Sequence, residues 1–413
     1  AGTVSAVTSK SMAHRLLILS ALAQSPSELV CSTSSEDIEA TRRCLDALDA
    51  SEQPCTLDCG ESGSTLRFLL PVIGALGKSA RIIRHGRLAS RPLTPLDEQL
   101  RVHGMDITDD GDDLVVCGRL HGGSFSLPGN VSSQFVSGLL MAAPLLAGPC
   151  EVFVTTPVQS RPYITMTISA LGRFGAEVTC DRVGMGPATC ERFAIEPGTL
   201  RGPARLEVEG DWSCAAFWLA AGALEEEGLT VSGLDLMSAQ GDRSILAALA
   251  ALGARIARQG TSARATRDAP RPASLDVSAI PDLVPPLAAV MATAPGTSRL
   301  RNAGRLRLKE SDRLATVSAA INALGGHARP EGDDLVIEGV AQLAGGDVDA
   351  ANDHRIAMMA AVMATHAAGP ATVRGAECVA KSYPSFWDDY RSLGGQATEE
   401  QAVSAARTQE HRA

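Results

Sequence analysis

The sequence predicts a mixed α/β protein made of two similar domains, and three observations support this prediction. The chain has 413 residues, enough for two or three domains at about 100 to 200 residues each. A helical apolar pattern that ends in glycine and runs into a strand-like segment recurs about every 70 residues. A stretch containing Gly and Pro, at residues 196–203, divides the chain near its middle. We therefore expect compact domains with internal pseudo-symmetry.

The repeats number six, three on each side of that stretch. Five of them end at a glycine, namely Gly104, Gly175, Gly253, Gly325 and Gly394, and a weaker copy ends near residues 47–49. Glycine at these points suits the left-handed residue that closes a helix before a strand begins. Two copies continue into predicted hairpins at residues 109–116 and 331–337, where a polar turn with glycine joins a β-branched run.

Composition excludes several classes of protein. Apolar residues make up 45% and charged residues 20%, close to globular averages, so an extended disordered or coiled-coil chain does not fit. The longest apolar stretches, Leu16–Ala23 and Gly138–Gly148, fall short of the ~18 residues that a bilayer requires. Residues 1–9 show no secretory signal, so we expect a cytoplasmic protein. The net charge of −10 argues against broad binding to nucleic acid or membranes.

The cysteines and lysines indicate which kinds of ligand the protein binds. The ten cysteines form no Cys-x-x-Cys pair and no zinc-like spacing with histidine, so we expect neither a metal nor a cofactor. The four lysines are Lys10, Lys78, Lys309 and Lys381. Three of them lie in polar clusters, where a compact ammonium group suits an anionic ligand.

In the first half, the polar clusters precede helices. They are Ser9–Arg15, Glu61–Arg67, Ser132–Gln134 and Ser160–Tyr163. Helix starts offer free N–H groups and bind phosphate readily, although simple helix capping by serine is the alternative reading. Cations such as Lys10, Arg15, Arg67 and Arg91 favour an anion site, because a cation near a positive helix end is unfavourable without an anion between them. His14 has no matched partner, and we expect a structural role for it.

In the second half, carboxylates alternate with cations. The clusters are Pro281–Asp282, Arg305–Arg313, Asn352–Arg355 and Lys381–Pro384. Lys309 and Arg313 are four residues apart, which predicts that they share a helix face. A solvated charged face is the alternative to a binding site here.

Taken in order, these motifs resemble the 5-enolpyruvylshikimate-3-phosphate synthase family. The resemblance implies an α/β fold of two similar pseudo-threefold domains, each built of three βαβαββ units, the inside-out α/β barrel of enolpyruvyl transferases. It places an N-terminal domain at 10–208, a C-terminal domain at 1–9 and 209–395, and a tail at 396–413. Ligands would bind between the domains, which close on them and exclude water.

The resemblance also implies a reaction. The enzyme, a transferase of the shikimate pathway, would transfer the enolpyruvyl group of phosphoenolpyruvate to the 5-hydroxyl of shikimate 3-phosphate, and glyphosate would inhibit it. The implied catalytic residues are Asp282, Glu310, Lys10 and Lys381. Shikimate 3-phosphate would be held by Lys10, Ser11, Arg15, Ser132, Ser133, Gln134, Ser160, Asp282 and Lys309. Phosphoenolpyruvate would be held by Lys10, Gly63, Arg91, Gln134, Arg313, Arg355 and Lys381. We expect a monomer whose partners are these small molecules.

The sequence departs from the pattern of many members in three places, and two other functions remain open. Val7-Thr8 replaces a frequent Pro-Gly, and Glu61 and Arg305 each replace a frequent Asn. One alternative is the related enolpyruvyl transferase that acts on UDP-N-acetylglucosamine, which usually has a mobile-loop cysteine that residues 85–92 lack here. The other is a non-catalytic phosphometabolite-binding module of the same fold, which loss of Asp282, Glu310 or Lys381 would indicate.

Overall fold

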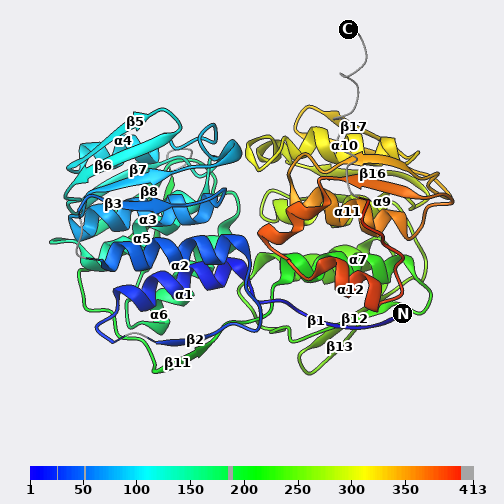
Figure 1. Ribbon diagram of the computed structural model, residues 1–413, viewed down its shortest axis with the longest axis horizontal. Helices are drawn as coiled ribbons and strands as arrows, with labels where there is room; N and C mark the ends of the chain where they lie inside the picture. The colour runs from blue at the N-terminus through cyan, green and yellow to red at the C-terminus, as the bar shows by residue number, and fades with distance from the viewer. Residues whose placement is uncertain (26, 51–52, 185–188, 401–413) are drawn as a thin grey trace, which may run out of the picture.

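The computed structural model describes residues 1–25, 27–50, 53–184 and 189–400 and shows two lobes side by side (Figure 1). One hydrophobic core is formed by residues between Met12 and Val208. The other is formed by Val4, Val7 and residues between Trp212 and Tyr390. The chain therefore starts in the second lobe, builds the first and returns. Most of the predicted tail, residues 401–413, lies outside the described residues.

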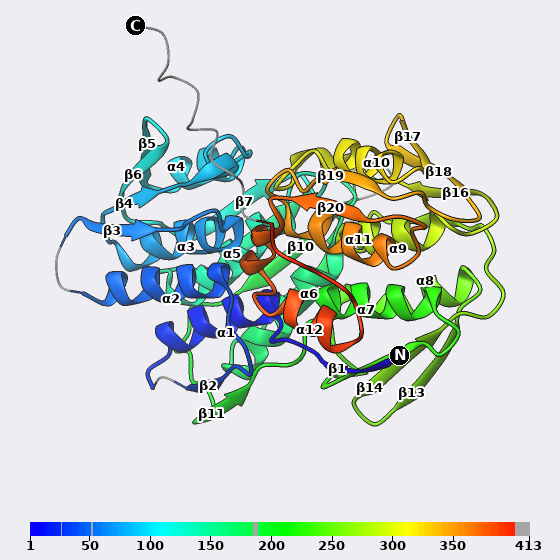
Figure 2. The ribbon, with the colours of Figure 1, turned by 45° about the vertical axis from the view of Figure 1, so that its right-hand side comes forward.

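The two crossing segments lie next to each other. The Ser9 N–H donates to the Glu209 carbonyl at 2.8 Å, and Thr8 forms a bridge with Gly210. In the rotated view of Figure 2, the N-terminal strand runs below the second lobe. This strand, β1 (Gly2–Ser5), pairs in parallel with β12 (Leu229–Ser232), so the first residues of the chain complete a sheet more than 200 residues away.

Four repeats have the full βαβαββ order. In the first lobe, one consists of β3 (Cys55–Asp58), α3 (Gly63–Leu76), β4 (Ala80–Ile83), α4 (Leu96–Val102), β5 (Met105–Asp110) and β6 (Asp113–Gly118). The next consists of β7 (Gly123–Leu127), α5 (Ser133–Ala142), β8 (Cys150–Val154), α6 (Arg161–Arg173), β9 (Thr179–Val183) and β10 (Cys190–Ile195). Each forms a four-stranded sheet with a parallel pair and an antiparallel hairpin.

The second lobe repeats this order twice. One sheet combines β1 with α7 (Trp212–Leu224), β12, α8 (Ile245–Ala251), β13 (Arg255–Gln259) and β14 (Ser262–Thr266). The other unit consists of β15 (Ser274–Asp276), α9 (Val284–Met291), β16 (Gly296–Arg301), α10 (Arg313–Ala323), β17 (His327–Glu331) and β18 (Asp334–Gly339).

The remaining unit of each lobe is shorter. In the first lobe it combines β11 (Arg205–Glu207), α1 (Lys10–Leu22), β2 (Glu28–Val30) and α2 (Glu36–Asp49). In the second lobe it consists of β19 (Gly346–Asp349), α11 (His354–Ala364), β20 (Ala371–Arg374) and α12 (Phe386–Ser392). Among the described residues, each has a two-stranded parallel sheet in place of four strands. The weak sequence copy near residue 49 belongs to the first of these units, which explains why it continues into no hairpin.

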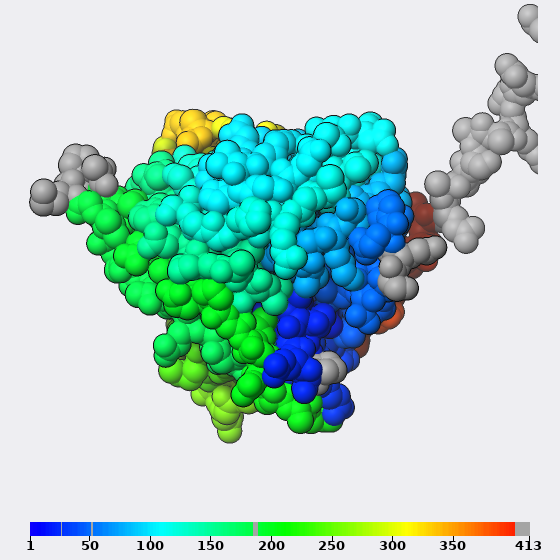
Figure 3. Space-filling view, turned by 90° about the vertical axis from the view of Figure 1, so that its left-hand side faces the viewer, coloured from blue at the N-terminus to red at the C-terminus, as the bar shows by residue number. Residues whose placement is uncertain are grey.

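Three helices form the centre of each lobe, and the sheets lie outside them (Figure 1). Helices α1, α3 and α5 contact one another, as do α7, α9 and α11. Every residue of α7 is buried, and its sequence is apolar on all sides, which suits a helix surrounded by protein. Figure 3 looks onto the first lobe, whose surface belongs mostly to the blue-to-green part of the chain.

The predicted turns are confirmed. Gly104, Gly175, Gly253, Gly325 and Gly394 all have positive φ, between 79° and 103°, as expected of residues that close helices. Both predicted hairpins form, as β5–β6 and β17–β18. Two further hairpins, β9–β10 and β13–β14, have less obvious turn sequences and were not predicted.

One local prediction is wrong. Lys309 and Arg313 do not share a helix face, because residues 304–308 form a 3₁₀ turn and α10 begins only at Arg313. The side chain of Asp312 accepts a hydrogen bond from the Ala315 N–H and so caps the helix at that point. Arg313 is 1% exposed, which also excludes a solvated charged face there. Across the described ranges, the helices are too short or too polar to cross a membrane.

Candidate active site

The two lobes present different helix starts to the cleft between them. In the first lobe, Ser9, Ser62 and Ser132 cap α1, α3 and α5 through their side-chain oxygens. In the second lobe, Asp211 and Asp353 cap α7 and α11 in the same way. A neutral serine leaves the positive helix end available to an anion, whereas an aspartate compensates it. The first lobe is therefore suited to binding phosphate, and the second supplies carboxylates.

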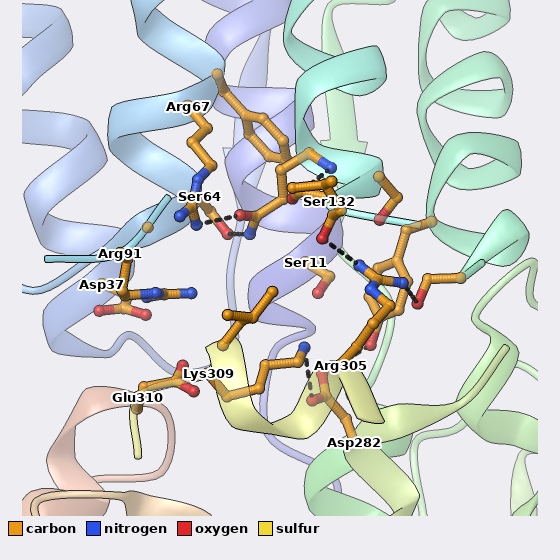
Figure 4. A pocket seen from close by; sticks show the side chains of 18 of the residues that line it. Ser11, Asp37, Ser64, Arg67, Arg91, Ser132, Asp282, Arg305, Lys309 and Glu310 are labelled. Atoms are coloured by element: carbon orange, nitrogen blue, oxygen red, sulfur yellow. Dashed lines mark hydrogen bonds and ion pairs between the residues drawn. The ribbon is translucent and has the colours of Figure 1, made fainter. Parts of the chain in front are cut away.

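A cavity lies between the lobes, and side chains from both converge on it (Figure 4). Its lining has seven cationic side chains against three carboxylates, although the whole chain carries a net charge of −10. Thirteen predicted site residues line it: Lys10, Ser11, Arg15, Gly63, Arg91, Ser132, Ser133, Gln134, Ser160, Asp282, Lys309, Glu310 and Arg355. This local positive charge is what an anionic ligand requires in an acidic protein.

The other two predicted residues lie just outside the cavity wall. Arg313 is buried below it and donates to Asp282 (2.8 Å), Glu310 (2.6 Å) and Asp353 (2.7 Å), so it holds three carboxylates in place. Lys381 lines a neighbouring cleft instead, where its ammonium donates to the Glu61 carboxylate at 2.8 Å.

Among the carboxylates that line the cavity, Asp282 has the most hydrogen-bond and ion-pair partners. It accepts from the Tyr163 hydroxyl at 2.8 Å and lies 3.2 Å from Lys309, 2.8 Å from Arg313 and 3.3 Å from Arg355. Burial alone would raise the pKa of Asp282, but the three cations outweigh it and hold the pKa well below its usual range. The carboxylate is therefore ionised in the ligand-free site.

Glu310 is ionised for the same reason. Burial favours its neutral form, but Arg313, at 2.6 Å, and Arg91 outweigh that effect and hold the pKa of Glu310 well below its usual range. In Figure 4, Glu310 and Arg91 lie on one side of the cavity, and Asp282 and Arg305 on the other. The two carboxylates thus face different parts of the same space.

The lysines differ in their surroundings. Burial would lower the pKa of Lys10, but Asp37, whose Oδ2 lies 2.8 Å from Nζ, and Glu310 outweigh this effect, so the pKa is raised. For Lys309 burial prevails over the attraction of Asp282, and the pKa is lowered. Lys10 is therefore a fixed positive charge, and Lys309 is the more easily deprotonated of the two.

Two polar side chains of the first lobe are set by specific hydrogen bonds. The Gln134 amide accepts from Arg67 and donates to Ser64, both at 2.9 Å, so its orientation in the cavity is fixed. Ser160 precedes α6 but makes no capping hydrogen bond, so the alternative of simple capping does not apply to it. Its backbone is left-handed, with φ of 56°, and its hydroxyl accepts from Arg305 at 2.9 Å across the cleft.

Some residues of the site had no predicted role. Asp37 pairs with Lys10, and Tyr163 donates to Asp282, yet neither carries a pattern beyond its position at the start of a helix. Arg305 lines the cavity and joins the two lobes. His14 is buried against Thr41, at 2.7 Å, away from the cavity lining, in keeping with the structural role expected for it. Within the described ranges, no cluster of three or more His, Cys, Asp or Glu could hold a metal ion.

Comparison with known proteins gives one consistent result. The family model for EPSP synthase (3-phosphoshikimate 1-carboxyvinyltransferase) matches residues 1–54 and 49–390. The 3-phosphoshikimate 1-carboxyvinyltransferase of Clostridium kluyveri is 38% identical over 96% of both chains. That of Clostridium perfringens is 36% identical over 95% of this chain and 96% of its own. Among solved structures, an EPSP synthase from Acinetobacter baumannii superimposes with a TM-score of 0.74, at 25% identity over 95% of both chains.

Proposed function

The chain belongs to the EPSP synthase (3-phosphoshikimate 1-carboxyvinyltransferase) family, and from that membership we propose which residues of the cavity bind each substrate and which move protons. The enzyme transfers the enolpyruvyl group of phosphoenolpyruvate to the 5-hydroxyl of shikimate 3-phosphate and releases phosphate, a step of aromatic biosynthesis in the shikimate pathway. The observation that carries the proposal is the cationic cavity between the lobes, with one ionised carboxylate on each side.

The serine-rich side of the cavity is proposed to bind shikimate 3-phosphate. Ser132 and Ser133 stand at the start of α5, where free N–H groups and hydroxyls suit a phosphate. Ser160 and Lys309 face the same region, next to Asp282. Ser11, Arg15 and Gln134 complete this set. Asp282 then stands where it can accept the proton of a substrate hydroxyl.

The arginine-rich side is proposed to bind phosphoenolpyruvate. Arg91 and Arg355 line the cavity and can bind a carboxylate or phosphate bidentately. Lys10 lines the same cavity, close enough to Glu310 and Arg355 for their charges to act on its ammonium, and we assign it to both substrates. Gly63 presents backbone without a side chain at the start of α3. Gln134 also faces this region, and Arg313 and Lys381 support it from outside the wall.

The two carboxylates are proposed to divide the proton transfers. Asp282 accepts the proton of the 5-hydroxyl as it attacks C2 of phosphoenolpyruvate, and Glu310 delivers a proton to the methylene carbon, which gives a tetrahedral intermediate. Glu310 then takes a proton back from the methyl group as the C–O bond to phosphate breaks, which restores the carbon–carbon double bond, and the departing phosphate takes the proton held by Asp282. Because Glu310 is ionised in the free site, the anionic phosphoenolpyruvate must first offset Arg91 and raise the pKa of Glu310. Lys10 and Lys381 stabilise the charge that develops on the phosphate.

We also propose the domain bounds, the oligomeric state and the cellular location of the protein. We propose domains at 10–208 and at 1–9 with 209–395, supported by the two separate hydrophobic cores. We further propose a monomer, because one chain supplies both sides of the cavity. A cytoplasmic location is supported by ten free thiols, which a reducing compartment maintains.

Equilibrium binding tests the proposed division of the site. Shikimate 3-phosphate alone should bind the Ser133→Ala variant at least several-fold more weakly than the parent, because a hydrogen bond to its phosphate is lost. The Arg91→Lys variant should bind it as the parent does, while its KM for phosphoenolpyruvate rises. Equal losses of shikimate 3-phosphate binding in both variants would overturn the division.

A further inference from the structure

Glu61 belongs to the first lobe, yet its carboxylate is engaged by the second. The residue precedes α3 and is one of those that differ from many family members. Its Oε2 accepts from the Lys381 ammonium at 2.8 Å. Both of its oxygens also accept from the Asn352 side-chain amide, at 3.0 and 3.1 Å. These three residues, Glu61, Asn352 and Lys381, are called the clasp below.

Within the part of the chain that the structure describes, the Lys381 ammonium donates two hydrogen bonds. An ammonium has three N–H donors, and Lys381 gives one to Glu61 and one to the Asn352 carbonyl at 2.8 Å. The residue is 7% exposed and lines the neighbouring cleft, so little of its side chain is open to other contacts. Glu61 therefore fixes both the position and the direction of an ammonium that is assigned to phosphoenolpyruvate.

The clasp also reaches the segment that carries Arg355. Asn352 has a left-handed backbone, with φ of 54°, a conformation that costs free energy in any residue other than glycine. The next residue, Asp353, caps α11 by accepting from the Arg355 N–H. By holding the Asn352 side chain, Glu61 holds the turn that sets the start of α11 and thus the position of Arg355.

A third contact joins Glu61 to the loop that carries Arg91. Gly86 lies so close that an added Cβ would stand 2.6 Å from the Glu61 carboxyl carbon. The same loop is tied down by His85, whose N–H donates to the Gly60 carbonyl at 2.9 Å. One carboxylate thus contacts all three segments that supply Arg91, Arg355 and Lys381.

We propose that Glu61 is a positioning residue for phosphoenolpyruvate, which holds the three segments that carry its cations in place across the cleft between the lobes. Because Glu61 and its partners come from different lobes, the clasp joins the two lobes directly. The inference rests on the assignment of Arg91, Arg355 and Lys381 made above. It assigns a role to a residue that touches no substrate and acts through Lys381 and Asn352.

The test uses the full-length enzyme and steady-state kinetics with each substrate varied in turn. Glu61→Gln removes the charge but keeps the shape. A hydrogen bond to a charged group contributes about 1.5 to 3 kcal/mol, so KM for phosphoenolpyruvate should rise about tenfold or more. KM for shikimate 3-phosphate should stay within about twofold, as should both constants in the control Glu28→Gln, which breaks an exposed ion pair with Arg205 at 2.7 Å.

A second variant separates positioning from general stability. Asn352→Asp places a second carboxylate against Glu61 and should also raise KM for phosphoenolpyruvate. The double variant, Glu61→Gln with Asn352→Asp, again pairs an amide with a carboxylate and keeps one negative charge beside Lys381. Its KM for phosphoenolpyruvate should therefore return most of the way to the parent value. Thermal unfolding of all variants should stay close to that of the parent.

Three results would overturn the inference. These are an unchanged KM for phosphoenolpyruvate in Glu61→Gln, an equal rise of KM for both substrates, and a double variant no better than Asn352→Asp alone. Failure of the underlying assignment would look different, because Lys381→Met would then leave KM for phosphoenolpyruvate unchanged.

Discussion

Gly63→Ala is the substitution whose effect the structure defines most directly. Gly63 opens α3 inside the cavity. A Cβ built on it would lie 2.7 Å from Nη1 of Arg91 and 2.9 Å from Nη1 of Arg67, whereas ordinary contact begins at 3.4 Å. Arg67 is buried and held by Gln134 and the Pro92 carbonyl, so it has little room to move. The Arg91 guanidinium is the freer group and must retreat by several tenths of an ångström.

The size of the effect follows from this displacement. Overfilling a packed site costs about 1 to 3 kcal/mol, which corresponds to roughly 5- to 150-fold in affinity. Phosphoenolpyruvate is short, and its other cations remain in place, so we expect its KM to rise at the lower end of that range. Glyphosate is longer and must use the space that the methyl group and the displaced guanidinium occupy, so its inhibition constant should rise towards the upper end.

The assay measures phosphate release at varied phosphoenolpyruvate and glyphosate, in the parent, in Gly63→Ala and in a control. Gly172→Ala is the matched control, because Gly172 lies in α6 with nothing within 4 Å of an added Cβ. The parent should show competition between glyphosate and phosphoenolpyruvate. An inhibition constant that rises no more than KM would refute the steric reasoning, as would a parent that is insensitive to millimolar glyphosate.

Three further predictions address the proton and charge chemistry. Lys10→Ala should nearly abolish turnover, while its thermal unfolding stays close to that of the parent. A kcat/KM equal to that of the parent would show that Lys10 does not contact the substrates. Asp282→Ala and Glu310→Ala should each lower kcat by about 10²- to 10⁴-fold, with smaller changes in substrate binding; a variant altered only in KM would make that carboxylate a binding group. Asp242 is buried near Asp282, and burial with that neighbour raises its pKa to about 7 from 3.8. Folded protein then binds more protons than unfolded protein between about pH 4 and 7, so the free energy of unfolding should fall as pH rises through that window. Asp242→Asn should remove this fall in denaturant titrations from pH 5 to 8, and parallel curves for parent and variant would contradict the assignment.

Much of the fold could be predicted because its signals are local. A glycine after a helix and a polar turn between β-branched runs are set by neighbouring residues, and the structure confirms both at the predicted positions. The helix start at Lys309–Arg313 was predicted wrongly because charge spacing alone does not show where a helix begins. The side chain of Asp312, which caps α10, decides that start.

The contacts of the site were harder to predict because they join distant segments. Lys10 on one helix pairs with Asp37 on another. Glu61 forms an ion pair with Lys381, although the two residues are 320 positions apart in the sequence. Composition and spacing contain no information on such pairs, since they depend on how the lobes are placed. The resemblance to the family indicated candidate residues for the cavity, but Lys381 lies outside the cavity wall, which depends on how the two lobes pack.

The most direct test of the account is a product assay of the parent enzyme with phosphoenolpyruvate and either shikimate 3-phosphate or UDP-N-acetylglucosamine. We predict that phosphate appears only with shikimate 3-phosphate, in an amount equal to the phosphoenolpyruvate consumed and to the enolpyruvyl ether formed. Phosphate release with the nucleotide sugar and none with shikimate 3-phosphate, or no release with either, would contradict it.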